Sequence, residues 1–217
     1  MNNNTISANS ADENGGGLRL HLEDLVSFTS VNNTVSGNNA GIEGGGLHIT
    51  TMDSVVVTLR SNTITDNSSD TPFEAGGLYV FDSGSDNTFN VINTIIANSP
   101  SDINDDCSLS TFSDGLTIDS VSIIEDGTCG ALRFDDPGLL PLAENGGLTL
   151  THALSESSIA LNTGASCEPN DQRSEARTDV CDVGAYESEL QPTLPPQSNN
   201  DFLVIPLANG KTVVVPN

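Results

Sequence analysis

A block of the form Asn-Thr-(Ile/Val)-x-x-Asn recurs four times in the first half of this chain. Its copies begin at Asn4, Asn33, Asn62 and Asn93. The starts therefore lie 29, 29 and 31 residues apart. A glycine-rich marker keeps the same period, in the runs Gly15–Leu18, Gly44–Leu47 and Ala75–Leu78. Two phased motifs at one period predict a solenoid in which each period is one structural unit.

The residues between the markers favour strands over helices. They are rich in Asn, Ser, Thr, Gly and Val, whereas helical repeats need strong helix formers with apolar residues three and four apart. Apolar side chains instead recur at every second position, as in Val55, Val57 and Leu59. We expect three short strands and three turns per period, with coils rising about 4.8 Å each. The predicted fold is an all-β, right-handed parallel β-helix of the pectin-lyase-like type, the hand following from the crossover rule.

Asparagine closes every copy of the repeated block, at Asn9, Asn38, Asn67 and Asn98. Asparagine tolerates a left-handed backbone, and its amide can bond an equivalent amide one coil away. We therefore predict a structural asparagine ladder at these four positions. The glycines are expected to serve tight turns. A phosphate-binding loop is disfavoured because neither a Lys-Ser/Thr pair nor a helix follows them.

The chain is strongly acidic, with 30 Asp and Glu against 6 Lys and Arg and a net charge of −24. This balance argues against nucleic acid and anionic membranes as partners, because both require basic patches. It suits calcium, salt water or positively charged partners, although solubility alone also explains an acidic surface. No stretch reaches the roughly 20 apolar residues of a membrane helix. Because no signal peptide or N-terminal capping repeat is visible, we expect the chain to be the C-terminal part of a longer protein.

Four cysteines lie beyond the regular repeats, as two local pairs: Cys107 with Cys129, and Cys167 with Cys181. Three connectivities are formally possible. Zinc binding by these cysteines is disfavoured because no close Cys-x-x-Cys or Cys/His spacing is present. Disulfides are the favoured interpretation, and they imply an oxidising extracellular or periplasmic setting.

Motifs in the second half resemble the choice-of-anchor Q family. They are Ala143–Leu154, Ser158–Gly164, Asp171–Arg173 and Cys181–Glu187. The resemblance covers about residues 107 to 187 and implies a bacterial surface or secreted β-helix protein with no assigned catalytic residues, followed by an anchoring or sorting tail. The chain departs from the family pattern at Leu148, where Pro is usual, and at Ser174, where Gly is usual. The upstream repeats are also similar, more weakly, to those of chlamydial polymorphic outer-membrane proteins, which are adhesins.

The same module is expected to act as a cap on the end of the solenoid. Its charged residues include Asp171, Arg173, Arg177 and Asp182, together with Asp179 and Glu187. Ion pairs among them would fix the loop between Cys167 and Cys181. An active site built from the same acids and arginines is the alternative interpretation.

The sequence divides into four regions. Residues 1–106 are predicted to form the coils, and residues 107–187 the terminal coils and the cap. Residues 188–200 read as a Pro-rich linker. Residues 201–217 carry two apolar runs around Asn209-Gly210, which predicts a β-hairpin that docks on its own solenoid, a partner or a sorting machine.

An enzymatic β-helix would need a base or a carboxylate pair in a defined arrangement. Arg19 and Arg60 occupy different coil positions, and His21 and His48 are also out of phase. An acidic column is suggested by Glu43, Glu74 and Glu144, which each precede a marker leucine by four residues, with Glu13 displaced by one. Stacked carboxylates would repel unless a cation such as Ca²⁺ bridged them, although a solvated turn face is the simpler interpretation. A second, weaker metal candidate is the set Asp102, Asp105 and Asp106.

These observations lead to one expectation and two alternatives. We expect a non-enzymatic secreted or cell-surface protein whose stiff polar surface serves adhesion or assembly, with a glycan, another cell-surface ligand or copies of itself as partner. A glycan-active enzyme or carbohydrate-binding solenoid is the first alternative. A fibre-forming subunit joined through its C-terminal hairpin is the second.

Overall fold

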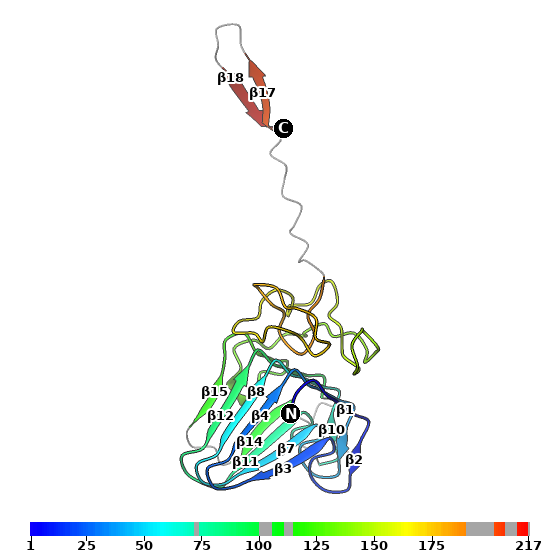
Figure 1. The fold of residues 1–217 in the computed structure, drawn as a ribbon, viewed down its shortest axis with the longest axis vertical. Helices are drawn as coiled ribbons and strands as arrows, with labels where there is room; N and C mark the ends of the chain where they lie inside the picture. Colours follow the sequence, from blue (N-terminus) through cyan, green and yellow to red (C-terminus); the bar gives the residue numbers. More distant parts are fainter. Residues whose placement is uncertain (72–73, 100–105, 111–114, 190–201, 207–211, 217) are drawn as a thin grey trace.

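The computed structural model describes residues 1–71, 74–99, 106–110, 115–189, 202–206 and 212–216. The repeats wind into a β-solenoid of about four coils, in which every pairing between neighbouring coils is parallel (Figure 1). The predicted parallel β-helix is confirmed. No described helix is long and apolar enough to cross a membrane.

Each coil contributes strands to three main sheets. Sheet 1 contains β3 (Leu18–Leu22), β7 (Leu47–Thr51), β11 (Leu78–Asp82) and β14 (Cys107–Ser110). Sheet 2 contains β4 (Ser27–Val31), β8 (Val56–Arg60), β12 (Thr88–Ile92) and β15 (Leu116–Ile118). Sheet 3 contains β1 (Thr5–Ser7), β5 (Thr34–Ser36), β9 (Thr63–Thr65), β13 (Ile95–Ala97) and β16 (Ile123–Ile124).

A fourth, shorter sheet departs from the expected three strands per coil. It contains β2 (Ser10–Ala11), β6 (Asn39–Ala40) and β10 (Ser68–Ser69), which are each two residues long. These segments follow the ladder asparagines and lead the chain from sheet 3 into the glycine-rich turn before sheet 1.

The repeat shifts by one residue in the third coil. In sheet 3, Thr5 pairs with Thr34 and Thr34 with Thr63, but Thr63 pairs with Ile95 and not with Thr94. The cause is the turn between β11 and β12, residues 83–87, which is one residue longer than the turn between β7 and β8, residues 52–55. The fourth copy of the block is therefore out of register with the first three.

The predicted asparagine ladder is present at three of its four positions. Asn9 Nδ2 donates to Asn38 Oδ1 at 3.0 Å, and Asn38 Nδ2 donates to Asn67 Oδ1 at 2.9 Å. Each Oδ1 also accepts the backbone N–H of the preceding rung. Asn98 does not belong to the ladder: because of the register shift, its amide donates to Thr65 Oγ1 at 3.1 Å.

The left-handed residues are not the ladder asparagines themselves. Positive φ occurs one residue before each rung, at Ala8, Gly37 and Asp66. Asn98 also has positive φ, because the register shift places it at the position equivalent to Asp66. The expectation that the rungs are left-handed was therefore wrong for Asn9, Asn38 and Asn67.

A second ladder runs through the first residue of the block. Asn4 Nδ2 donates to Asn33 Oδ1 at 3.1 Å, and Asn33 Nδ2 donates to Asn62 Oδ1 at 3.2 Å. Asn62 N–H then donates to Thr94 Oγ1, which ends the amide column. Buried amides satisfied in this way tie neighbouring coils together.

The glycine marker serves close approach between coils. A Cβ on Gly45 would lie 2.0 Å from the carbonyl oxygen of Ser68, and one on Gly16 would lie 2.3 Å from that of Asn39. Gly15 and Gly44 have φ of 74° and 65°, so the turns before β3 and β7 also need a left-handed residue.

Two hydrophobic cores lie on opposite faces of sheet 3. The first fills the solenoid and contains inward residues of all three sheets, such as Val35, Ile49, Leu59 and Phe89. The second lies on the outer face of sheet 3, where Ile95 and Ile123 pack with Leu154, Leu161 and Val183. We call the segment that covers this face, residues 139–188, the flank module.

The flank module occupies a different place from the predicted cap. It returns along sheet 3 as far as the first coil, where Gln172 Nε2 donates to Thr5 Oγ1 at 3.0 Å. His152 contacts Ser36 Oγ, and Ala185 N–H donates to Thr63 Oγ1. In Figure 1 the module forms the yellow and olive loops beside the strands. The module covers the side of the solenoid because sheet 3 presents two kinds of outward group to it. The hydroxyls form hydrogen bonds with the module, and the apolar side chains form the second core with it.

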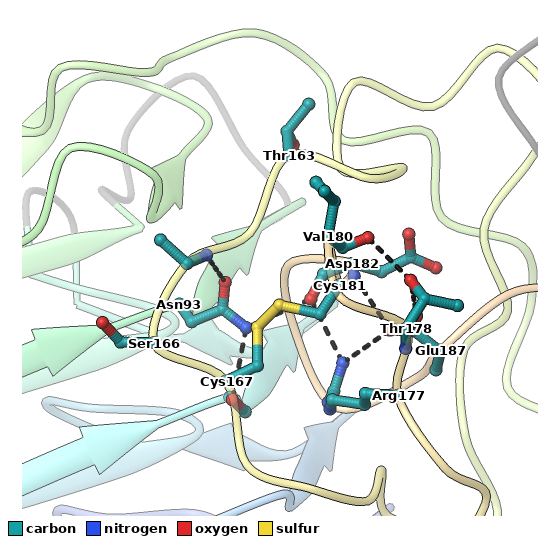
Figure 2. The surroundings of a disulfide bond; sticks show 12 residues. Asn93, Thr163, Ser166, Cys167, Arg177, Thr178, Val180, Cys181, Asp182 and Glu187 are labelled. Atoms are coloured by element: carbon teal, nitrogen blue, oxygen red, sulfur yellow. Dashed lines mark hydrogen bonds and ion pairs between the residues drawn. A yellow bond between two sulfur atoms is a disulfide. The ribbon is translucent and has the colours of Figure 1, made fainter.

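The two disulfides join the expected pairs, Cys107–Cys129 and Cys167–Cys181. Cys107 begins β14 and Cys129 lies in the 3₁₀ turn η1 (Thr128–Gly130), and both belong to the solenoid core or pack against it. This bridge closes the last coil, whereas Cys167–Cys181 lies within the flank module (Figure 2). The strands β17 (Phe202–Pro206) and β18 (Thr212–Pro216) pair antiparallel, as the hairpin prediction requires. Asn209-Gly210 and nearly all of the predicted linker lie outside the described residues.

Candidate functional site

The structure does not assemble the predicted acidic column. Glu43 and Glu74 occupy neighbouring coils, since Gly44 N–H donates to the carbonyl of Ala75. Glu144 belongs instead to the flank module, where it lines a hollow with Thr5 and Ser7 of β1. In the described part of the chain, no group of three or more His, Cys, Asp and Glu side chains is arranged to hold a metal ion. The expectation for Glu144 was wrong because its loop is not a coil of the solenoid.

Asp106 is buried and hydrogen bonded, which leaves little capacity for a bound cation. Its carboxylate accepts the N–H groups of Ser99 and Asp126, at 3.0 and 3.2 Å. Burial raises the pKa of Asp106 to about 6. Asp102 and Asp105, the other members of this candidate set, lie outside the described residues.

The outer face of sheet 1 carries the clearest cluster of chemically active side chains. Arg19, His48 and Tyr79 stand in register on β3, β7 and β11. The His48 ring stacks on the Tyr79 ring with centroids 5.2 Å apart, and His48 Nε2 lies 3.2 Å from Glu43 Oε2. Arg19 pairs with Glu13 at 3.5 Å on the surface. Arg60, by contrast, lies on sheet 2 and pairs with Glu168 at 3.4 Å.

His48 is closed off although it points outward from the solenoid. Only 3% of the residue is exposed. Burial lowers the pKa of His48, while the neighbouring Glu43 acts in the opposite direction. Burial likewise raises the pKa of Tyr79. His21, one residue before β3 ends, is exposed and lies 2.6 Å from Glu23. Hollows of about 620 and 430 Å³ elsewhere on the surface are lined by other residues.

The charged residues of the flank module form structural contacts, and Figure 2 shows Arg177, Asp182 and Glu187 beside the Cys167–Cys181 disulfide. Arg173 pairs with Asp171 at 2.8 Å, as predicted. Arg177 pairs with Glu187 at 3.1 Å and not with the carboxylate of Asp182.

Arg177 donates instead to the backbone carbonyl of Asp182 at 3.1 Å, because backbone N–H groups already occupy the carboxylate of Asp182. This carboxylate accepts the N–H groups of Asn162 and Ser188, at 2.7 and 2.6 Å. Burial raises the pKa of Asp182 to about 6. Glu187 similarly accepts from Thr178 and from the backbone of Asp182. Since these carboxylates are buried and committed to the loop, the cluster supports the structural interpretation over the active-site alternative.

Three residues that join the flank module to the solenoid were missed by the sequence reasoning. Gln172 and His152 contact hydroxyl groups of sheet 3, and Asn32 donates to the carbonyl of Asn170 at 2.8 Å. Gln172 stands within the motif Asp171–Arg173, which was the only available signal for it.

These features define the chain as a parallel β-helix protein with a side-docked, disulfide-bonded module. A scan of protein-family models found no match, and searches of curated proteins and of solved structures found none either.

Proposed function

We propose that this chain is a non-enzymatic, extracellular or cell-surface β-helix of bacterial origin that binds a glycan or another cell-surface ligand on its outer sheets. The observation that carries the proposal is a column of polar side chains on sheet 2: Thr29, Thr58, Asn90 and Thr117 stand in register on four successive coils. Each is at least partly exposed. Hydroxyl and amide groups repeating at about 4.8 Å suit a polar, extended ligand.

Other features support this proposal. Two disulfides fit an oxidising environment outside the cell. The side-docked module contains the motifs that resemble the choice-of-anchor Q family, and membership of that family is part of the proposal. Catalysis is disfavoured because His48 is closed off, and because the acids of the flank module that we have described are hydrogen bonded in place.

A glycan array and a polysaccharide panel test the proposal, each with and without Ca²⁺. Binding and the release of reducing or unsaturated ends are recorded together. We expect binding without release. The Thr58→Arg and Asn90→Arg variants should weaken binding at least tenfold, whereas Thr50→Arg, on the outer face of sheet 1, should leave it unchanged. Release of sugar ends would replace the proposal by the enzymatic alternative, and loss of binding only in Thr50→Arg would move the site to sheet 1.

The antiparallel pair β17–β18 favours assembly as a second candidate function. Under this alternative the hairpin joins one molecule to the next, as strands do in β-augmentation. Light scattering of the full chain and of a variant lacking residues 190–217 tests it. Oligomers or fibres formed only by the full chain would support assembly, and identical monomers would exclude it under those conditions.

A further inference from the structure

Three side chains at the outer surface of sheet 1 bring polar atoms into a nearly equilateral triangle. His48 Nε2 lies 3.2 Å from Glu43 Oε2 and 3.2 Å from Asn14 Nδ2. Asn14 Nδ2 lies 3.3 Å from Glu43 Oε2. The residues belong to neighbouring coils, because Asn14 precedes β3 whereas Glu43 and His48 lie before and within β7. We call this group the Asn14–Glu43–His48 triangle.

Hydrogen bonding cannot satisfy all three sides of this triangle while Glu43 is ionised. If His48 Nε2 carries the proton, it donates to Glu43, but it then faces the N–H of Asn14, donor against donor. If His48 Nε2 is bare, it accepts from Asn14, but its lone pair then faces the carboxylate. One of the three contacts is unfavourable in either tautomer.

Two buried polar atoms in the same cluster have no hydrogen-bond partner: Asn14 Oδ1 and His48 Nδ1. The two ends of a carboxamide are nearly interchangeable in shape, so turning the Asn14 amide over places Oδ1 at the triangle. Three lone pairs, from Asn14 Oδ1, Glu43 Oε2 and His48 Nε2, then converge on one point. Coordination through Nε2 would also fix His48 as the neutral tautomer with its proton on Nδ1.

We propose that the Asn14–Glu43–His48 triangle binds one divalent transition-metal ion of the zinc type, with water completing the coordination. Tetrahedral zinc holds nitrogen and oxygen ligands at about 2.0–2.1 Å, which places the ligand atoms about 3.3 Å apart. The three observed separations agree with this spacing. An imidazole nitrogen with two oxygens selects zinc, nickel or copper over calcium, which takes six to eight oxygen ligands. Tyr79, stacked on His48, holds the ring in place.

Cobalt substitution tests this site directly. Co²⁺ is added to the full chain in the presence of excess Ca²⁺, which occupies the many surface carboxylates, and visible absorption is recorded. We expect one equivalent of Co²⁺ to give the intense spectrum of a tetrahedral ion, and Zn²⁺ to displace it. His48→Gln should weaken Zn²⁺ binding, measured calorimetrically, by at least about 100-fold, more than the loss of a supporting outer-shell group.

His21→Gln is the matched control, because His21 lies on the same face of sheet 1 and also contacts a carboxylate. It should bind Zn²⁺ like the parent chain. Glu43→Gln and Asn14→Ala provide further tests if His48→Gln does not fold, as judged by circular dichroism, and each should reduce affinity at least tenfold. Any one of three results would overturn the proposal. These are an equal loss of Zn²⁺ affinity in His21→Gln, an octahedral cobalt spectrum, and unchanged affinity in folded His48→Gln or Glu43→Gln.

Discussion

Gln172 accepts a hydrogen bond from the hydroxyl of Thr34 at 2.7 Å, across 138 residues of sequence. Both side chains are buried, Thr34 on the outer face of β5 and Gln172 in the flank module. This contact, with that from Gln172 to Thr5, fixes the module against the first two coils. The module is therefore held on the side of the solenoid by buried polar contacts as well as by the second core.

Replacing Gln172 by Ala should lower the free energy of unfolding by about 2–3 kcal/mol, because the buried hydroxyl of Thr34 loses its acceptor and the carbonyl of Leu150 loses one of its donors. Urea denaturation measures this change. In a double-mutant cycle with Thr34→Val, we expect a coupling of about 1 kcal/mol. Strictly additive losses would show that the two side chains do not act together.

The two kinds of asparagine in the repeats should respond differently to truncation. Asn38→Ala removes a rung of the ladder, so the N–H of Asn9 loses its acceptor and the carbonyl of Ile6 and the amide oxygen of Asn67 each lose a donor. We expect a loss of about 3 kcal/mol. Asn98→Ala is the matched control. It removes one part-buried contact and places Ala at positive φ, which should cost about 1 kcal/mol. Thermal unfolding compares the two, and equal losses would contradict the shifted register.

The sequence predicted the coils well because their signals are local and periodic. It misplaced the fourth block because asparagine serves two roles in this fold. Asn93 and Asn98 occupy the left-handed position before each rung, where their residue type fits as well as in the ladder. The extra residue in the turn after β11 leaves no distinct sequence mark.

The position of the flank module was harder to predict than its existence. The outward hydroxyls Thr5, Thr34 and Thr63 look like solvent-facing positions of a β-helix, and nothing in the sequence marks them as covered. Their partners lie more than 100 residues away. The Asn14–Glu43–His48 triangle was missed for a related reason, since Asn14 and His48 meet only when neighbouring coils stack.

His152 should make the docking of the flank module sensitive to acid. Its Nδ1 lies 2.7 Å from the carbonyl of Leu140, and its Nε2 lies 2.8 Å from Ser36 Oγ. Burial lowers the pKa of His152 below its usual 6.5, so the unfolded chain takes up a proton first as pH falls. The stabilisation is fully present above pH 6.5 and is lost as pH falls through the lower folded-state pKa.

The difference in unfolding free energy between the parent chain and His152→Asn isolates this effect. Asn keeps a donor near the position of Nδ1 and does not titrate. The parent should therefore lose more stability than the variant between pH 7 and pH 5. Parallel pH profiles would rule out His152 as the source.

The titration of Asp182 should change the free energy of unfolding in the opposite direction to that of His152. Burial raises the pKa of Asp182 from 3.8 to about 6, so the folded chain binds the proton more tightly between these values. The free energy of unfolding should then fall as pH rises from about 4 to about 6 and level off above that range. Comparing the parent with Asp182→Asn over pH 4–7 checks the sign. A parent profile that rises more steeply than that of the variant would contradict it.

The two disulfides should stabilise separate parts of the molecule. Cys107–Cys129 joins β14 to the turn that follows β16, whereas Cys167–Cys181 lies in the flank module. Replacing either pair by Ala should cost about 3 kcal/mol for loops of these lengths. Hydrogen exchange should then rise mainly in β14 and β16 for the first variant, and mainly in residues 160–188 for the second. A uniform increase in both variants would show instead that the solenoid and its module unfold only as a single cooperative unit.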